Sequence, residues 1–295
     1  MGFDTAYEAI SEETDTGHRW AFGTGFTDPL AGVDTAVPAG IDGGDLATYC
    51  LMLGDDALIM SHRLQQWLAR APELEEDTAL ANIALDLLGQ ARLLLARAGA
   101  ADESRRTEDD YAFGRDEHEF RNVRLAEVTD ADFAGLMARL LVFSTWRLAL
   151  LTRLRSSADP VLAAVAAQGV KELTYHRDYA AQWVIRLGDG TDYSRERMQA
   201  ALAATAPLVP ELFEPSAAEQ RLAAAAVAVD PADLRAEFDG VLEHVLGEAE
   251  LDWPESPGLA GVSGRAGRDG VHTEEMGGLL AELQSVARAL PGATW

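Results

Sequence analysis

LANIALDLLGQARLLLARAG, residues 80–99, is apolar on nearly every side when it is wound into a helix. A helix of this kind is surrounded by other helices, whereas a surface helix keeps one polar face. The acidic residues just before it, among them Glu73, Glu75 and Asp77, suit the positive end of a helix dipole. The sequence therefore predicts a helix from about residue 73 to 98 and places it at the centre of the fold.

The segments on both sides also have helical periodicity. An amphipathic pattern predicts a helix over 45–70, and Pro160 stands at the first position of a helix over 160–187. We expect further helices over 116–126, 131–155 with Asp130 as its N-cap, 192–213, 231–247, and 273–289 with Thr273 as its N-cap. The Gly- and Pro-rich residues 252–270 are expected to form a loop with solvated Arg265 and Arg268. No segment shows the alternation of a β-strand, so the predicted fold class is all-α, a helical bundle.

The composition excludes several classes of partner. The chain has 295 residues, with 49 acidic against 24 basic side chains and a net charge of -25. This charge repels phosphate backbones and anionic lipid surfaces, so we expect no nucleic acid and no membrane among the partners. The apolar residues 137–154 contain three arginines, which a membrane-spanning helix rarely accepts.

The chain's two ends and its single cysteine bear on location and domain organisation. Cys50 has no second cysteine to pair with, and the N-terminus lacks the basic and apolar regions of a signal peptide, so a cytoplasmic location is expected. Residues 1–42 are acidic and then rich in Gly, Thr, Asp and Pro without a sustained period. The sequence predicts a flexible acidic N-terminal extension over 1–42 and a helical domain over 43–295.

Polar side chains interrupt two of the apolar helix faces. Glu172 and His176 are four residues apart, so both lie on the apolar face of the helix over 160–187. Asn82 and Asp86, followed by Gln90, make a second polar line on the helix over 73–98. Burying such groups is costly unless they pair with one another, so we predict a buried polar network of Asn82, Asp86, Glu172 and His176. Arg147 and Lys171 are possible cationic partners for it.

A metal centre is the alternative interpretation of these residues. Di-iron carboxylate bundles use two single Glu ligands and two Glu-x-x-His pairs. Here Leu173 stands where the pair that ends at His176 needs Glu, and Gly89 stands where a second pair needs His. We therefore predict no catalytic residue, no metal and no cofactor in this chain. A di-iron oxidoreductase that uses Asp86, Glu172 and His176 stays open as the alternative.

Several separated blocks of sequence are similar to one known family. The blocks are LATYCLMLGDDALIMSHRL, APELEEDTALANIALDLLGQAR, FGRDEHEFRN, VKELTYH, RLGDGTD, AVDPADLR and GVHTEEMGGLLAELQSVARALPGATW, in this order over residues 45–295. They resemble the C subunits of bacterial phenylacetyl-CoA epoxidases. The resemblance implies a ferritin-like bundle with additional C-terminal helices, which acts as a non-catalytic structural subunit and binds a catalytic di-iron subunit. It further implies a complex that epoxidises phenylacetyl-CoA with oxygen and with electrons from NADPH, delivered through a reductase subunit, in aerobic phenylacetate degradation.

The same resemblance implies a contact with the coenzyme A portion of the substrate. It falls on Glu119, Phe120, Arg121 and Asn122 in the block FGRDEHEFRN, with a second contact near residues 220–222. Arg121 is the best anion contact because a guanidinium grips a phosphate with two hydrogen bonds. Helix packing and capping are the competing explanation for Phe120 and Asn122. A coenzyme A-ester binding module without catalysis is therefore a further alternative for the whole chain.

Overall fold

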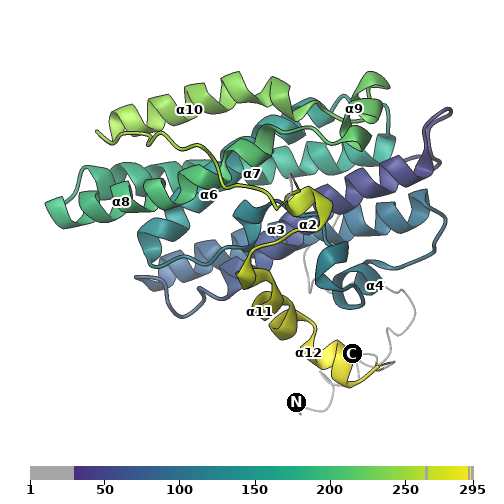
Figure 1. Cartoon of the computed structure of the whole chain (residues 1–295), viewed down its shortest axis with the longest axis horizontal. Helices are drawn as coiled ribbons and strands as arrows, with labels where there is room; N and C mark the ends of the chain where they lie inside the picture. Colours follow the sequence, from purple (N-terminus) through teal and green to yellow (C-terminus); the bar gives the residue numbers. More distant parts are fainter. Residues whose placement is uncertain (1–29, 263–264, 292, 294–295) are drawn as a thin grey trace, which may run out of the picture. The chain divides into compact units, whose positions relative to one another are not determined.

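The computed structural model of this chain describes residues 30–262, 265–291 and 293 (Figure 1). Most of the predicted extension, residues 1–29, lies outside the described residues. The compact unit that carries the fold begins at Val33, and the guanidinium of Arg97 donates hydrogen bonds to the carbonyl oxygens of Thr35 and Ala36. The fold therefore includes residues that precede the predicted boundary at residue 43.

Four long helices form the core: α2 (Gly43–Gln65), α3 (Leu74–Ala101), α6 (Phe133–Leu154) and α7 (Pro160–Gly188). Helix α2 packs along α3, α6 packs along α7, and α3 also contacts α7 (Figure 1). Asp42 caps α2 and Asp159 caps α7, each by accepting a hydrogen bond from a backbone N–H of the first turn. The predicted all-α bundle is confirmed, and its arrangement is consistent with a ferritin-like fold.

The central helix is α6, which corrects the prediction that residues 73–98 hold this place. Helices α3 and α6 are equally hydropathic, and both are long and apolar enough to span a membrane by length and composition. The apolar window of α6 is 94% buried and that of α3 only 50%. The difference arises because α6 is also covered by α5 (Arg124–Glu127), α8 (Asp192–Thr205) and α10 (Arg235–Glu248), whereas these helices leave one side of α3 open. Composition alone does not reveal this coverage.

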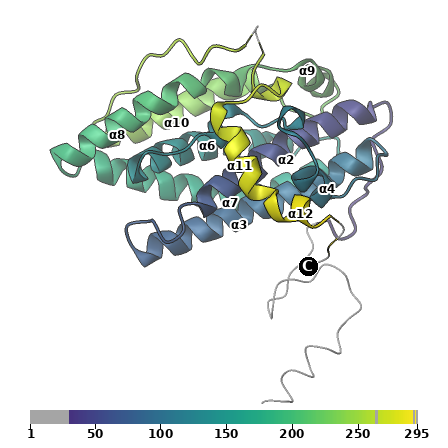
Figure 2. The same ribbon diagram turned by 60° about the horizontal axis from the view of Figure 1, so that its bottom comes forward.

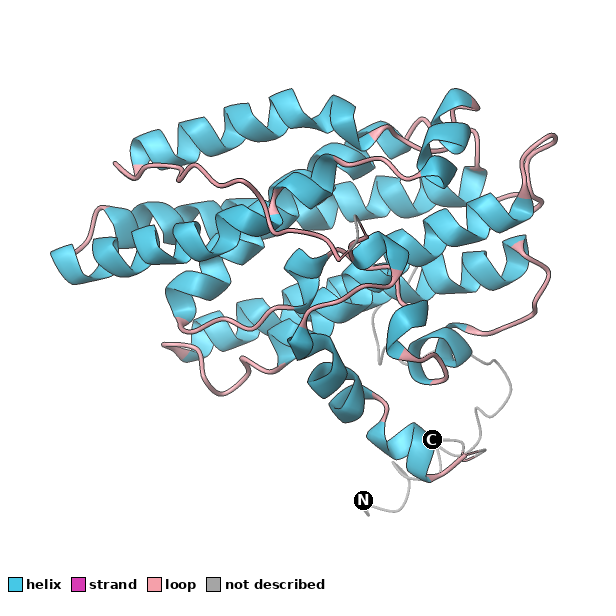
Figure 3. Ribbon diagram, in the orientation of Figure 1, coloured by secondary structure: helices cyan, strands magenta, loops and turns pink. Residues whose placement is uncertain are grey.

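Shorter elements complete the described part of the chain, and Figure 3 shows only helices and loops there. They are the α-helices α4 (Glu108–Phe113), α9 (Ala217–Ala224), α11 (Glu274–Leu283) and α12 (Ser285–Ala289), and the 3-10 helices η1 (Glu117–Glu119), η2 (Ala206–Leu208), η3 (Pro210–Phe213), η4 (Pro231–Leu234) and η5 (Gly267–Asp269). The single β feature among the described residues is an isolated bridge between Val262 and Arg265. Helix α11 contacts α2 and α5, and Figure 2 shows α11 and α12 running across the bundle.

The predicted helix over 116–126 is wrong. The structure has η1 and α5 there, separated by an extended stretch, because the backbone N–H groups of Arg121 and Val123 donate to buried carboxylates of α2 instead of to their own helix. The segment before it, which the sequence predicts as a break, contains α4. Thr107 and Asp110 form a capping box at its start, which the sequence TEDD encodes.

Three predicted helix ends also need correction. Asp132 caps α6, since Asp130 is engaged with Arg139 instead. The helix that begins at residue 192 ends at Thr205 and is followed by two 3-10 turns. Thr273 precedes α11 but its hydroxyl has no partner among the described residues, so it does not cap the helix.

Candidate functional site

The guanidinium of Arg147 lies at the middle of the four-helix core. It is carried by α6 and is fully buried. Its Nε donates to Oε1 of Gln90 on α3 at 3.0 Å, and its Nη1 donates to the carbonyl oxygen of Leu53 on α2 at 3.1 Å. Burial lowers the pKa of Arg147 to about 10, so the side chain stays protonated at neutral pH. One cation therefore ties three core helices together.

Gln90 links Arg147 to α7 by a second hydrogen bond. Its Nε2 donates to Oε2 of Glu172 at 2.8 Å, and Gln168 donates to the other carboxylate oxygen at 2.8 Å. Gly169 permits the close approach of the helices, because a Cβ there would lie 2.5 Å from Leu151 and 3.3 Å from the Gln90 amide. Arg147 thus reaches Glu172 through Gln90. The other predicted cation, Lys171, is exposed.

His176 and Asp86 make a second polar pair between α7 and α3. The distance from Nε2 of His176 to Oδ2 of Asp86 is 3.0 Å, and the imidazole is fully buried while the Asp86 side chain is 37% exposed. Nδ1 of His176 has no partner among the described residues. Asn82 is exposed, which corrects its predicted place in the network. The predicted network is therefore two pairs, Gln90–Glu172 and Asp86–His176, and only the first contacts Arg147.

Two consecutive acids of α2, Asp55 and Asp56, are fully buried beside this core. Asp55 accepts two hydrogen bonds from the guanidinium of Arg115 and a third from the backbone N–H of Arg121. Asp56 is held in the same way by Arg268, with both Nη–Oδ distances at 2.9 Å. Burial raises the pKa of Asp56 against the opposing effect of Arg268. The carboxylate oxygens that could ligate a metal are thus occupied by guanidinium groups.

Arg268 was predicted to be solvated, and this prediction is wrong. Besides Asp56, its guanidinium donates to the carbonyl oxygens of Met52 and Arg121, at 3.1 and 2.7 Å. Burial lowers the pKa of Arg268, but Asp56 and Glu219 raise it more, so that its pKa lies above the usual value. The signal that could have found this contact is the pair of apolar-face aspartates on α2, which need cations from elsewhere in the chain.

The segment with the predicted coenzyme A contact lies over Asp55 and Asp56. Phe120 is fully buried, with the guanidinium of Arg115 4.1 Å from its ring centre. Asn122 is also fully buried and donates to Glu127 at 2.8 Å.

The other two residues of this segment are partly exposed. Glu119 accepts a hydrogen bond from the backbone N–H of Asp116, and Arg121 donates from Nη1 to the carbonyl oxygens of His118 and Phe120, both at 2.8 Å. Near the second predicted contact, Arg221 of α9 pairs with Asp45. The contact with coenzyme A stays a prediction.

The residues at the middle of the bundle do not fit a dinuclear metal centre. They supply one imidazole and two carboxylates, whereas such a centre needs two histidines and four carboxylates. Arg147 brings a positive charge and N–H donors, which repel a metal ion and cannot ligate it. Among the described residues, the one group of ligands close enough to share an ion is Glu73, Glu75 and Glu76, at the start of α3.

The fold and the polar core around Arg147 place this chain among the all-α helical-bundle proteins. Residues 39–295 match the family model described as phenylacetic acid catabolic protein, and the chain belongs to this family of phenylacetate catabolism. It is 42% identical over 254 residues to the C subunit of the 1,2-phenylacetyl-CoA epoxidase of Escherichia coli strain K12. The match covers 85% of this chain and 99% of the relative. The resemblance found in the sequence is thereby confirmed.

Proposed function

We propose that this chain is a non-catalytic structural subunit of a phenylacetyl-CoA epoxidase, and that it supports the subunit that carries the di-iron centre. The observation that carries the proposal is the position of Arg147. Its buried guanidinium takes the place among the four helices where a metal-binding bundle concentrates carboxylates. The relative's name supplies the reaction class, and the polar core around Arg147 supports a non-catalytic role for this chain.

Arg147 performs for this fold what metal ions perform in a metal-containing bundle. It links α2, α3 and α6 directly and α7 through Gln90, with hydrogen bonds in a region of low dielectric. A rigid bundle presents a fixed surface to its partner at little entropic cost. The di-iron centre, and the electrons from NADPH delivered by a reductase, belong in this proposal to the other subunits of the complex, which we place in the cytoplasm.

Arg121 is the residue that we propose for contact with the coenzyme A portion of phenylacetyl-CoA. Glu119 is an acid, and Phe120 and Asn122 are enclosed by the fold. Arg121 is partly exposed, and burial lowers its pKa despite the nearby Asp55, yet a guanidinium stays charged at neutral pH. Its two bonds to backbone carbonyls hold the side chain in place. Arg121→Ala is expected to weaken coenzyme A-ester binding by the assembled complex and to leave assembly unchanged, and binding assays that show no change would refute this contact.

Metal analysis by mass spectrometry tests the structural role. We expect iron in the complex with the catalytic subunit, at that subunit's stoichiometry, and none bound to the purified chain alone. His176→Ala and Asp86→Ala should leave the iron content of the complex unchanged, with an exposed variant such as His118→Ala as the control. Stoichiometric iron in the isolated chain that disappears in His176→Ala would instead establish a di-iron site here.

A further inference from the structure

Residues 265–273 form a strap that crosses the segment carrying Arg121, just before α11 begins. Its side chains contact backbone carbonyl oxygens of that segment. The guanidinium of Arg268 donates to the carbonyl oxygen of Arg121 at 2.7 Å, and Nε2 of His272 lies 3.3 Å from the carbonyl oxygen of Phe120. The strap therefore holds the two peptide groups that flank the Cα atom of Arg121.

Two glycines of the strap bring its backbone against the same segment. A Cβ at Gly267 would lie 2.2 Å from the carbonyl oxygen of Asn122, and a Cβ at Gly270 would lie 2.1 Å from that of His118. Gly270 also has a φ of +75°, a conformation that residues with a side chain rarely adopt. Because glycine allows this close approach at both positions, the strap fits residues 118–122 from end to end.

Helix α2 holds the other side of the segment. The backbone N–H groups of Arg121 and Val123 donate to Asp55 and Asp56, each at 2.8 Å. Arg268 of the strap pairs with the same Asp56. The backbone at Arg121 is thus fixed from two sides, while its side chain stays partly exposed.

Both ring nitrogens of His272 face hydrogen-bond acceptors. Nδ1 lies 2.7 Å from a carboxylate oxygen of Glu127, and Nε2 faces the carbonyl oxygen of Phe120. A neutral imidazole carries one N–H group, whereas an imidazolium carries two. Only the protonated ring can therefore donate to both acceptors at once. The side chains of His272 and Glu127 are both fully buried, so these bonds are shielded from water.

The charges around His272 favour the imidazolium. The charged and titratable side chains of the surrounding elements are Glu117 and His118 of η1, Arg121, Glu127 of α5, Arg63 of α2 and Glu275 of α11. Burial lowers the pKa of His272, but the hydrogen bond to Glu127 and the charges of Glu127 and Glu117 raise it more. The guanidinium of Arg63 is directed to the carbonyl oxygens of Glu127 and Glu275.

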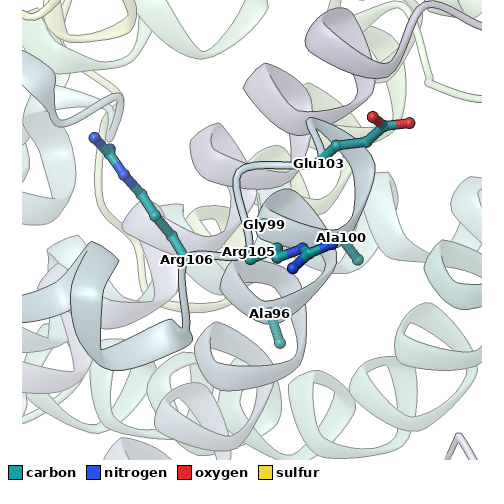
Figure 4. A pocket seen from close by; sticks show the side chains of 6 residues that line it. All are labelled: Ala96, Gly99, Ala100, Glu103, Arg105 and Arg106. Carbon is teal, nitrogen blue, oxygen red and sulfur yellow. The ribbon is translucent and has the colours of Figure 1, made fainter.

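The cavity at the end of α3 is a less suitable place for an anion. It has a volume of about 490 Å³, and Arg105 and Arg106 extend beside it from the loop (Figure 4). Glu103 lines the same cavity, and Glu108 follows close behind in the sequence, so acids oppose the two positive charges. Arg121 differs because its backbone is held by both α2 and the strap.

We propose that the strap positions Arg121 for an anionic ligand, and that the proton on His272 keeps the strap closed over the segment. When the ring loses this proton, one of its two buried acceptors is left without this donor, which is costly. The strap then opens more readily, because its apolar side chains, Ala266 and Val271, are only partly buried. The inference rests on the proposed contact of Arg121 with coenzyme A and makes His272 a positioning residue for it.

Hydrogen exchange of the full chain at a series of pH values, followed by mass spectrometry, tests the strap without a ligand. After correction for intrinsic exchange, protection of the strap and of residues 118–123 should fall as the pH rises through the folded-state pKa of His272, while that of α6 stays unchanged. His272→Gln should abolish this fall, and His244→Gln, at an exposed position of α10, should behave as the wild type. Protection that is independent of pH in the wild type, or that falls equally in α6, would overturn the proposal.

Gly270→Ala breaks the fit of the strap without changing His272. Its Cβ meets the carbonyl oxygen of His118, so residues 118–123 should lose protection at every pH. Gly40→Ala is the matched control, since Gly40 has a φ of +80° and no atom within 4 Å of its Cβ position. It introduces the same backbone strain without the contact. Equal protection of residues 118–123 in the two variants would contradict the fit.

Binding of phenylacetyl-CoA to the assembled complex, at one pH at which His272 is protonated, tests the positioning of Arg121. Arg121→Ala should weaken binding by about tenfold, the loss of one charged hydrogen bond, and His272→Gln by about threefold. The double variant should bind as Arg121→Ala alone does, because His272 acts through Arg121. Additive losses would refute the positioning role. An unchanged affinity in Arg121→Ala would instead refute the contact with coenzyme A, and the exchange experiments would still decide whether the proton closes the strap.

Discussion

Helices α3 and α6 have the same mean hydropathy over their apolar windows and opposite surroundings. Helix α6 is enclosed by other helices and buries two arginines, Arg139 and Arg147. Helix α3 buries one side and exposes leucine, glycine and alanine on the other. Charge within an apolar helix therefore marks the centre of this fold, because a buried cation with fixed partners links its neighbours. Apolar composition alone, which α3 shares with α6, does not place a helix at the centre.

The largest expected effect comes from breaking the centre of α6. Arg147→Ala should lower the free energy of unfolding by about 4 kcal/mol, because it leaves a cavity and removes the partner of Gln90 and of the Leu53 carbonyl. Urea denaturation followed by circular dichroism measures this. Arg153→Ala, at the half-exposed end of the same helix, should stay within about 0.5 kcal/mol of the wild type. Equal losses in both variants would show that Arg147 contributes no more to stability than an arginine at the exposed end of the same helix.

The two sides of α3 can be compared with a single type of substitution. Leu87→Ala on the buried side should cost about 3 kcal/mol. Leu85→Ala on the exposed side should change the free energy of unfolding by no more than about 0.5 kcal/mol. A large loss for Leu85→Ala would mean that this side of α3 is covered.

Glu172 is a half-buried polar group, so its substitution can be compared with that of the fully buried Arg147. Glu172→Ala should lower the free energy of unfolding by about 1 kcal/mol, because the Gln90 amide loses its acceptor while water can replace part of it. Glu172→Gln keeps an acceptor and should cost less. Thermal and urea unfolding of both variants provide the test, and a loss as large as that of Arg147→Ala would place Glu172 at the centre of the network.

The smallest expected effect is a change in the pH dependence of stability, caused by the titration of His272. Burial lowers the pKa of His272, but its hydrogen bond to Glu127 at 2.7 Å raises it more, so the pKa lies above 6.5. The folded state thus binds this proton more tightly than the unfolded state does. The stabilisation is complete below pH 6.5 and is lost as the pH rises through the folded-state pKa.

His272→Gln should remove this part of the pH dependence of the unfolding free energy. Burial lowers the pKa of His62, so His62 contributes with the opposite sign: it makes stability rise with pH below pH 6.5, and His62→Gln should remove that rise. An exposed side chain that does not titrate offers a control, since Thr78→Ser should leave the profile unchanged. A profile that is the same in all three variants would contradict the assignment.

The features that follow from local sequence were predictable. The start of α7 at Asp159-Pro160 and the inward positions of Glu172 and His176 depend on capping and on helical spacing, which short segments encode. Contacts between distant segments were not predictable in this way. Arg268 meets Asp56 across 212 positions of sequence, and no local pattern distinguishes it from the neighbouring Arg265. The prediction that Asn82 is buried was wrong for the same reason, because only the packing of α3 against other helices decides which side of α3 is exposed.

The contact between Asp56 and Arg268 has a consequence for how the protein is made. During synthesis, α2, α3, α6 and α7 leave the ribosome long before residue 268 does, and domains begin to fold as they emerge. Until then the nascent bundle holds an aspartate without its guanidinium partner in an apolar environment, which is costly. A segment that emerges well after the four core helices therefore completes the interior of α2, and a chain truncated before residue 268 is expected to be less stable.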